Sequence, residues 1–496
     1  MDLPHDAKGP LTCGHLISCS PVPLFNSASG HHHGFHIRWR VKKVGTTVLA
    51  RWAVRRFTSV ASCIAVLILC VSGCVRQGQC DAWSRRASVD VLWSRLARDY
   101  AYFESAREGE EHRKAAQKLM DQVATRREYI EALATELNTL NDPHVQLTNL
   151  GEYWRRSTGN DLRPAYRALY NYGGCYWVGF APEAIVRTEA SPTLPDQALY
   201  QLVSVCGIPA GTLAMQLLRS EPGIQIRVNV LAMDGNVYAL DVQVPMPEHV
   251  TATRPNTSQP AEAARAHRRH PPRSKVHARR FDDLGYIRID ELDDERVVKD
   301  FDEALDGLED TKALILDLRG NGGGEWDCAK AVLARFVATT APYGYMQFPH
   351  GGILPGVGLR LWHSLPMVVK PRGKTYRRPI VVLIDTTTVS SAELLTMGLK
   401  DLCDATLVGH HTAGASAGVL EVTLPDGLKV SYSAFPTRRL DNRTYQYVGI
   451  APDVEFEVNR ARICREGWIG VMTQHADEVT KAREIAAAKA KLWSGE

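Results

Sequence analysis

The sequence predicts a multidomain α/β protein, and three observations carry this prediction. Its 496 residues are enough for two to four domains. Residues 88–140 show apolar side chains at helical spacing, and from Phe281 onward strand patterns alternate with helix patterns. Such alternation typically builds a largely parallel sheet covered by helices. The composition, 45% hydrophobic and 23% charged, is globular and excludes collagen-like, fully disordered and disulfide-scaffold proteins.

The N-terminal segment has the pattern of a secretion signal. A basic stretch at 51–56 precedes an apolar run from Val60 to Val71, which is too short for an ordinary membrane-spanning helix. The following Val71-Ser72-Gly73-Cys74 resembles the lipobox of bacterial lipoproteins, in which the cysteine is acylated. We therefore expect residues 1–74 to be a leader and signal peptide, with Cys74 anchoring the protein in the bacterial cell envelope, facing the periplasm. A plain secretory signal, or an uncleaved anchor, is the alternative.

Two domains are predicted to follow the signal. Residues 80–147 read as an N-terminal helical domain that Asn141-Asp142-Pro143 ends, which puts His144 at the domain exit. Residues 148–250 read as a small β-rich domain of short strands, with one helix near 210–219. Residues 251–280 are rich in Arg, His and Pro and predict a basic, flexible linker. Outside the two basic segments, 1–74 and 251–280, the chain is acidic, so nucleic acid is not expected as its main partner.

Residues 281–460 carry the strand and helix alternation and are predicted to form an α/β domain. A β-hairpin is expected around Pro425-Asp426-Gly427, and residues 461–496 are expected to hold a charged C-terminal helix. The strands are expected at 285–289, 313–317, 380–385 and 405–409, and the helices at 297–308, 329–336 and 390–402.

Two loops that follow strands in this domain could carry chemistry. The first, Asp317-Leu318-Arg319-Gly320-Asn321-Gly322-Gly323-Gly324, could point backbone amides at a phosphate or at an oxyanion, but it lacks the spacing of the known phosphate loops. The second contains Ser390-Ser391-Ala392-Glu393, which reads as a capping box with Ser390 at the N-cap. The same position would place a nucleophilic serine beside the free N–H groups of a helix.

Taken together, DLRGNGGG, TVSSAELL, ATLVGHHTAGAS, LPDG and VGIAPDV resemble the serine peptidases of the C-terminal processing and tricorn type. The resemblance runs from about Trp83 to Val458, with LNDPHVQL similar to that family's L-x-D-G-H-T segment and LVSVCGIPA similar to its PDZ-like or β-rich middle. It implies that residues 281–460 are a catalytic domain with a crotonase-like fold, and that the β-rich residues 148–250 resemble a PDZ domain.

The resemblance also implies roles for individual residues. Ser390 matches the nucleophile, and the backbone N–H groups of Ser391 and of Gly322 or Gly323 would form the oxyanion hole. Ala415 stands where one branch of the family has a catalytic lysine, so a Ser-Lys dyad is not expected. The other branch uses a histidine, which His144 matches, with His410 and His411 as rivals; Gln446 stands where that branch has an orienting glutamate. Asp317 and Arg319 are expected to pair within the fold.

The resulting expectation is a serine peptidase that acts on peptide or protein substrates, with no metal and no organic cofactor. The six cysteines after Cys74 form no CxxC pair, and none is spaced with histidines as a zinc site would require. Two alternatives remain open. One is a catalytically inactive peptide-binding protein that keeps the fold, which Pro143, Ala415 and Gln446 favour. The other is a crotonase-type enzyme acting on thioesters, which would not need Ser390.

Overall fold

The computed structural model describes residues 77–103, 106–159, 162–181, 184–186, 197, 199–245, 274–349 and 361–495. The signal segment with Cys74 and most of the expected basic linker lie outside these residues. No helix among the described residues has both the length and the apolar character that crossing a membrane requires.

The N-terminal part is helical, as the spacing of its apolar residues predicts. Helices α2 (Gln77–Asp99), α3 (Ala106–Met120) and α4 (Arg126–Asn138) pack together, and α5 (Leu150–Thr158) follows after a short strand. Helix α4 begins with a capping box, in which Thr125 Oγ1 accepts a hydrogen bond from the Glu128 N–H and the Glu128 carboxylate accepts one from the Thr125 N–H.

An antiparallel sheet of seven strands forms the next part. Six strands follow the order β3-β4-β6-β9-β10-β5, and β7 pairs with β6 off this path. Helix α6 (Thr212–Leu217) contacts β6 and β7. The strands span Ala168–Tyr172 (β3), Cys175–Gly179 (β4), Ile185–Val186 (β5), Tyr200–Val205 (β6), Ile208–Pro209 (β7), Gln225–Leu231 (β9) and Val237–Gln243 (β10), and the short strands Arg163–Pro164 (β2) and Arg219–Ser220 (β8) pair separately.

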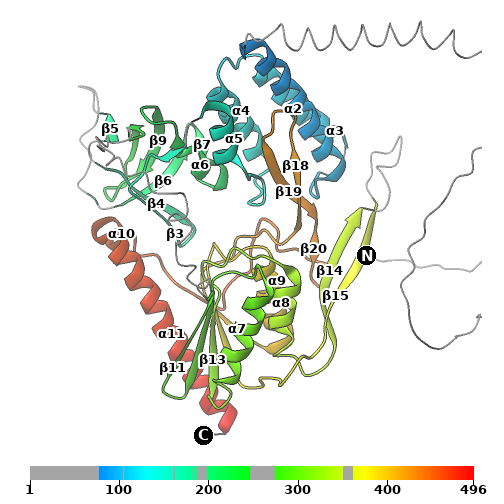
Figure 1. Cartoon of the computed structure of the whole chain (residues 1–496). Helices are drawn as coiled ribbons and strands as arrows, with labels where there is room; N and C mark the ends of the chain where they lie inside the picture. Colours follow the sequence, from blue (N-terminus) through cyan, green and yellow to red (C-terminus); the bar gives the residue numbers. More distant parts are fainter. Residues whose placement is uncertain are drawn as a thin grey trace, which may run out of the picture. The chain divides into compact units, whose positions relative to one another are not determined.

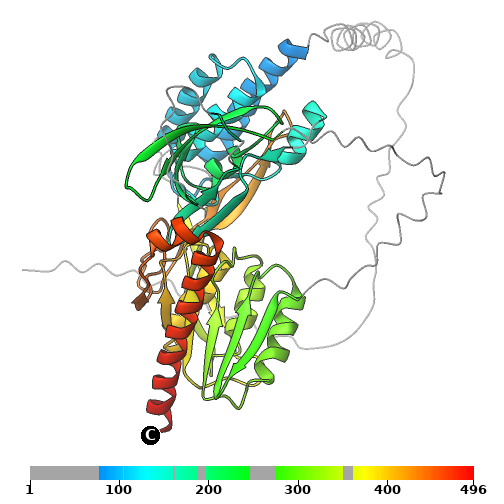
Figure 2. The same cartoon turned by 90° about the vertical axis from the view of Figure 1, so that its left-hand side faces the viewer.

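A six-stranded sheet, in the order β11-β12-β13-β16-β17-β21, is the centre of the C-terminal part. Every neighbouring pair is parallel except β11 with β12. Helices α7 to α9 lie together on one face, and α11 runs along the other face (Figures 1 and 2). The bounds are Val276–Phe281 (β11), Leu284–Ile289 (β12), Ala313–Asp317 (β13), Ile380–Ile384 (β16), Thr406–Gly409 (β17), Val454–Glu455 (β21), Glu295–Asp306 (α7), Trp326–Leu333 (α8), Ser391–Cys403 (α9), Arg460–Glu466 (α10) and Trp468–Ser494 (α11).

The expected linker is corrected at its C-terminal end, because residues 276–280 belong to strand β11 rather than to a flexible segment. This strand lies at the edge of the sheet, and its middle residues Ala278, Arg279 and Arg280 are exposed. Edge strands often carry charged side chains, which discourage pairing with another chain. Its arginines therefore give it the composition of the linker that precedes it.

A long hairpin from the C-terminal half of the chain packs against the N-terminal helical part. Strands β18 (Gly418–Thr423) and β19 (Lys429–Phe435) pair with each other, and β19 also pairs with β1 (Gln146–Leu147), with Gln146 opposite Ser431. The hairpin shares one apolar cluster with α2 to α5 and the seven-stranded sheet. Strands β14 (Ala341–Pro349), β15 (Trp362–Val369) and β20 (Thr437–Arg438) form a further small sheet.

Candidate functional site

Ser390 lies between the end of β16 and the start of α9, at the carboxyl edge of the parallel strands. Its backbone has φ 58° and ψ −123°. This conformation is energetically unfavourable for any residue other than glycine. Its side chain makes no capping hydrogen bond to α9, so the serine half of the capping box expected from the sequence is wrong. Because the hydroxyl does not cap the helix, Ser390 resembles a presented nucleophile more than a structural cap.

The glycine-rich loop packs directly against Ser390. A Cβ atom on Gly323, whose φ is +92°, would lie 2.8 Å from the Ser390 Cβ and 2.7 Å from the carbonyl oxygen of Val389. The N–H of Val389 donates to the carbonyl oxygen of Asn321 at 3.0 Å, which ties the two loops together. Only a residue without a side chain allows this approach. The structure thus brings together the two loops that the sequence singled out.

Three backbone amides near Ser390 were expected as oxyanion donors, and they differ in their present partners. No described residue accepts a hydrogen bond from the N–H of Ser391, the first residue of α9, and none accepts one from the exposed Gly322. The Gly323 N–H, in contrast, donates to Asn321 Oδ1 at 2.9 Å. The amides of Ser391 and Gly322 are therefore the ones that a bound anion could engage without breaking a bond.

Glu393 supports Ser390 in a way that the capping interpretation missed. Its buried carboxylate accepts hydrogen bonds from Thr412 Oγ1 at 2.5 Å and from the N–H groups of Gly414 at 2.8 Å and Ala415 at 2.7 Å. The carbonyl of Ala415 in turn accepts the Ser390 N–H at 2.8 Å. Burial raises the pKa of Glu393 to about 7, although these donors favour the charged form. Glu393 thus fixes the 412–415 loop, which holds the Ser390 backbone.

His144 lies two residues before the start of β1 and is 6% exposed. Its Nδ1 lies 3.1 Å from Ser433 Oγ on β19, and its Nε2 is buried with no hydrogen-bond partner among the described residues. Burial lowers the pKa of His144, and the nearby charge of Asp142 opposes this shift. The ring is therefore held neutral at neutral pH, with one nitrogen unengaged, as a general base requires.

The orienting role expected for Gln446 is corrected by its contacts. Its Nε2 donates to Asp142 Oδ1 at 3.3 Å rather than to His144, and the same Oδ1 accepts the backbone N–H of His144 at 3.0 Å. Ser433, which the sequence analysis did not single out, is the residue that faces the imidazole. Its position in an alternating strand gives it no sequence signal, because only the pairing of β19 with β1 brings it beside His144.

Hydrogen bonds connect the 412–416 loop, which holds Ser390, to the chain segments next to Gln446 and next to β19. The carbonyl of Gly414 accepts the N–H of Tyr447, which follows Gln446, and Ser416 Oγ lies 2.7 Å from Thr437 Oγ1 just beyond β19. No hydrogen bond between Ser390 and His144 occurs among the described residues, and catalytic bonds are often absent without substrate.

The rival histidines lie in other surroundings. His411 is exposed, whereas the Nε2 of the buried His410 lies 3.1 Å from Oε1 of Glu478 on α11. The expected pairing of Asp317 with Arg319 is confirmed, with Arg319 Nε and Nη2 donating to the two carboxylate oxygens at 2.9 and 2.6 Å. No cluster of three His, Cys, Asp or Glu side chains suited to a metal ion occurs among the described residues.

Parts of the chain are similar to known proteins. Carboxy-terminal processing protease CtpA of Bacillus subtilis (strain 168) is 25% identical over 177 residues, which are 35% of this chain and 35% of that protein. Nisin-resistance protein of Lactococcus lactis subsp. lactis is 26% identical over 170 residues, 32% of this chain and 49% of that protein. The chain thus spans between about a third and a half of these curated relatives.

A solved structure, mature CPAF complexed with lactacystin, superposes with a TM-score of 0.53 at 14% identity, covering 84% of this chain and 99% of that one, which supports the fold. Peptidase family S41 matches residues 283–456, a segment that contains Ser390, Ser391 and both candidate glycines but not His144. The matched segment runs from the turn before β12 to the end of β21, through the whole parallel sheet. Residues 283–456 are therefore a peptidase family S41 domain.

Proposed function

We propose that this chain is a serine peptidase that cleaves peptide or unfolded protein substrates through an acyl-enzyme on Ser390, with His144 as the general base. The observation that carries the proposal is the conformation of Ser390. Its backbone is held at positive φ at the start of α9, its side chain does not cap the helix, and the adjacent Ser391 amide has no acceptor among the described residues. These features match the needs of a nucleophile beside an oxyanion hole.

The reaction would proceed in two stages. His144 Nε2 takes the proton of the Ser390 hydroxyl as Oγ attacks the substrate carbonyl carbon, and the carbonyl oxygen becomes an oxyanion bound by the N–H groups of Ser391 and of Gly322 or Gly323. The intermediate collapses when His144 returns the proton to the leaving amine, which breaks the peptide bond. Water then attacks the acyl-enzyme in the same way and releases Ser390.

The surroundings of His144 support this direction of proton transfer. If Nδ1 carries the proton and donates a hydrogen bond to Ser433 Oγ, the lone pair of the buried Nε2 is free to accept the hydroxyl proton. The carboxylate of Asp142 accepts the backbone N–H of His144, and its negative charge would stabilise the imidazolium. Gln446 is uncharged and cannot supply this stabilisation.

The test is a comparison of turnover on a peptide substrate, together with labelling by a fluorophosphonate probe. Ser390→Ala and His144→Ala should each remove nearly all turnover, and the double variant should lose little more, because the two residues act as one unit. His411→Ala should keep most of the activity. An active His144→Ala protein beside an inactive His411→Ala protein would overturn the assignment of the base.

A second candidate function is peptide binding without catalysis. It is favoured by the absence of a Ser390–His144 hydrogen bond among the described residues and by Gln446 in the place of an acid. A wild-type protein that binds peptides but is neither labelled at Ser390 nor able to hydrolyse them would establish this alternative.

The finer fold assignments belong to the same proposal. The parallel layer with α7 to α9 on one face and α11 on the other is consistent with a crotonase-like catalytic domain. The seven-stranded antiparallel sheet with α6 is consistent with a PDZ-like domain that holds peptide substrates. Protection of the seven-stranded sheet from hydrogen exchange when C-terminal peptides bind to the full chain would test the second assignment.

We place the protein in the bacterial cell envelope, facing the periplasm and anchored through a lipid on Cys74. The support is the apolar run followed by Val71-Ser72-Gly73-Cys74. The wild-type protein should partition into detergent with membranes, and Cys74→Ser should release the protein or block its processing. Equal membrane recovery of a normally processed Cys74→Ser protein would contradict the anchor.

A further inference from the structure

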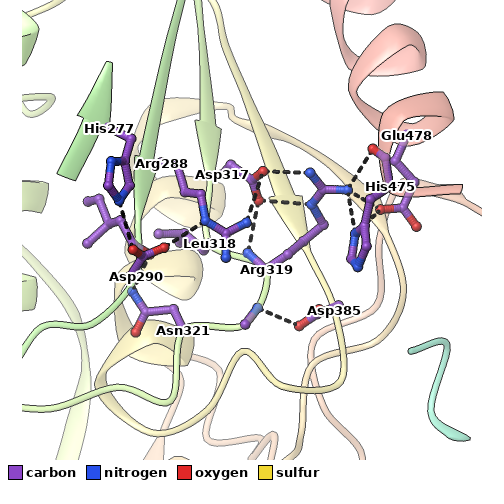
Figure 3. Close-up of polar contacts among 12 residues, drawn as sticks. His277, Arg288, Asp290, Asp317, Leu318, Arg319, Asn321, Asp385, His475 and Glu478 are labelled. Atoms are coloured by element: carbon purple, nitrogen blue, oxygen red, sulfur yellow. Dashed lines mark hydrogen bonds and ion pairs between the residues drawn. The ribbon is translucent and has the colours of Figure 1, made fainter. Parts of the chain in front are cut away.

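A buried ionic cluster joins the first residues of the glycine-rich loop to the C-terminal helix α11. Figure 3 shows Arg319 between Asp317 on one side and Glu478 with His475 on the other. The side chains of Asp317 and Glu478 are fully buried, and that of Arg319 is 4% exposed. A charge is seldom buried unless it is paired, so these three groups hold one another in place.

Arg319 uses its guanidinium fork on both sides. Nε and Nη2 bind Asp317, while Nη1 binds a carboxylate oxygen of Glu478 and the backbone carbonyl of His475, the latter at 3.0 Å. The planar fork fixes the angle between the two carboxylates, which a single ammonium group could not do. The backbone of Arg319 is thereby fixed relative to α11.

Arg319 lies in the same loop as Gly323, the glycine that packs against Ser390. The Gly320 N–H donates to Asp385 Oδ1, the Asn321 side chain donates to the Ile289 carbonyl, and Asn321 Oδ1 accepts the Gly323 N–H. These bonds fix the loop at its edges, and Arg319 is its only side chain among the described residues that reaches α11. A shift of Arg319 would therefore reach Gly322 through Gly320 and Asn321, the two residues between them.

We infer that Glu478 of α11 is a positioning residue, which acts through Arg319 to hold the amide of Gly322 at the distance that an oxyanion beside Ser390 requires. The inference rests on the proposed function for its effect on catalysis. It assigns a role to a helix that lies outside the residues matched by the peptidase family, at 283–456.

Glu478→Gln tests the inference, because it removes the charge and preserves the size of the side chain. Arg319→Lys is the second variant, since it keeps the charge and loses the fork. Asp477→Asn is the matched control: the same substitution class on the neighbouring residue of α11, where the Asp477 side chain is 56% exposed and lies 3.5 Å from Arg462. If Glu478→Gln fails to fold, Arg319→Lys carries the test.

Two measurements are made on the full chain. Hydrogen exchange of the 317–324 backbone should accelerate in Glu478→Gln and in Arg319→Lys but not in Asp477→Asn. On a peptide substrate, kcat should fall by at least about tenfold with KM little changed, because a displaced donor is felt in the transition state and a misplacement of about 1 Å can cost about 10²-fold. A variant that only weakens the fold would lower melting temperature without this split between kcat and KM.

A folded Glu478→Gln protein with unchanged exchange at 317–324 and unchanged kcat would overturn the inference. The double variant Glu478→Gln/Arg319→Lys should be no slower than the slower of the two single variants, since both substitutions break the same link. Fully additive losses in kcat would also contradict the inference. A wild-type protein that is neither labelled nor active would refute the proposed function instead. In that case the exchange measurement alone decides whether Glu478 positions the loop.

Discussion

Replacement of Gly323 by alanine tests the tight contact between the glycine-rich loop and Ser390. The added methyl group would lie 2.7 Å from the Val389 carbonyl oxygen, 2.8 Å from the Ser390 Cβ and 3.0 Å from the Ser391 nitrogen. Real Cβ atoms do not approach so closely, so the two loops must move apart. The left-handed backbone costs an alanine about 1–2 kcal/mol and overpacking costs about 1–3 kcal/mol, so we expect a loss of about 2–5 kcal/mol of stability.

The displacement should also separate Ser390 from its oxyanion donors. We therefore expect fluorophosphonate labelling of Gly323→Ala to slow by at least about 10²-fold. Thermal melting of Gly322→Ala provides the stability control, because a Cβ on that neighbouring glycine would meet no atom within 4 Å. The reasoning fails if Gly323→Ala is labelled at the wild-type rate and melts together with the wild type and Gly322→Ala.

Three further substitutions test the neighbours of the site. Glu393→Gln places an amide group where the carboxylate now meets N–H donors, so it should cost about 1–3 kcal/mol in urea unfolding and slow the labelling of Ser390; wild-type values for both would contradict this role. Ser433→Ala removes the oxygen beside His144 Nδ1 and should lower kcat by about tenfold or more at an unchanged melting temperature, whereas an unchanged kcat would show that the ring is oriented by other contacts. Burial lowers the pKa of His144, so the apparent pKa of the acid limb of kcat/KM should lie below the ordinary histidine value of about 6.5. Asp142→Asn should lower that apparent pKa further, because the Asp142 charge raises the pKa of His144. An apparent pKa that stays in place or rises in Asp142→Asn would refute the assignment of His144 as the base.

Local patterns were enough to predict the parallel sheet and the two loops. A buried strand such as Ala313–Asp317 is apolar up to its last residue, and the glycines after it permit a sharp turn. The order of these motifs also located Ser390 and Gly323, which lies against it. The three N-terminal helices followed from apolar spacing alone.

The remaining features depend on contacts between distant residues, which a single sequence does not display. The spacing from Ser390 to Glu393 fits a capping box, yet the Glu393 carboxylate is used by donors from the 412–415 loop. Gln446 meets Asp142 instead of His144, and nothing near Ser433 marks it as a partner of the imidazole. Glu478 stands in a charged helix whose pattern does not distinguish a buried carboxylate from a solvated one.

The pairing of β1 with β19 has a consequence for how the protein folds. It joins Gln146 to Ser431, residues very far apart in the chain, and His144 and Ser433 meet only once this ladder has closed. Closing so long a loop carries an entropic cost before any contact repays it, and contacts of high sequence separation form slowly. After dilution from denaturant, far-ultraviolet circular dichroism should therefore recover before the protein regains the ability to react at Ser390. Newly made chains would pass through a structured but inert stage.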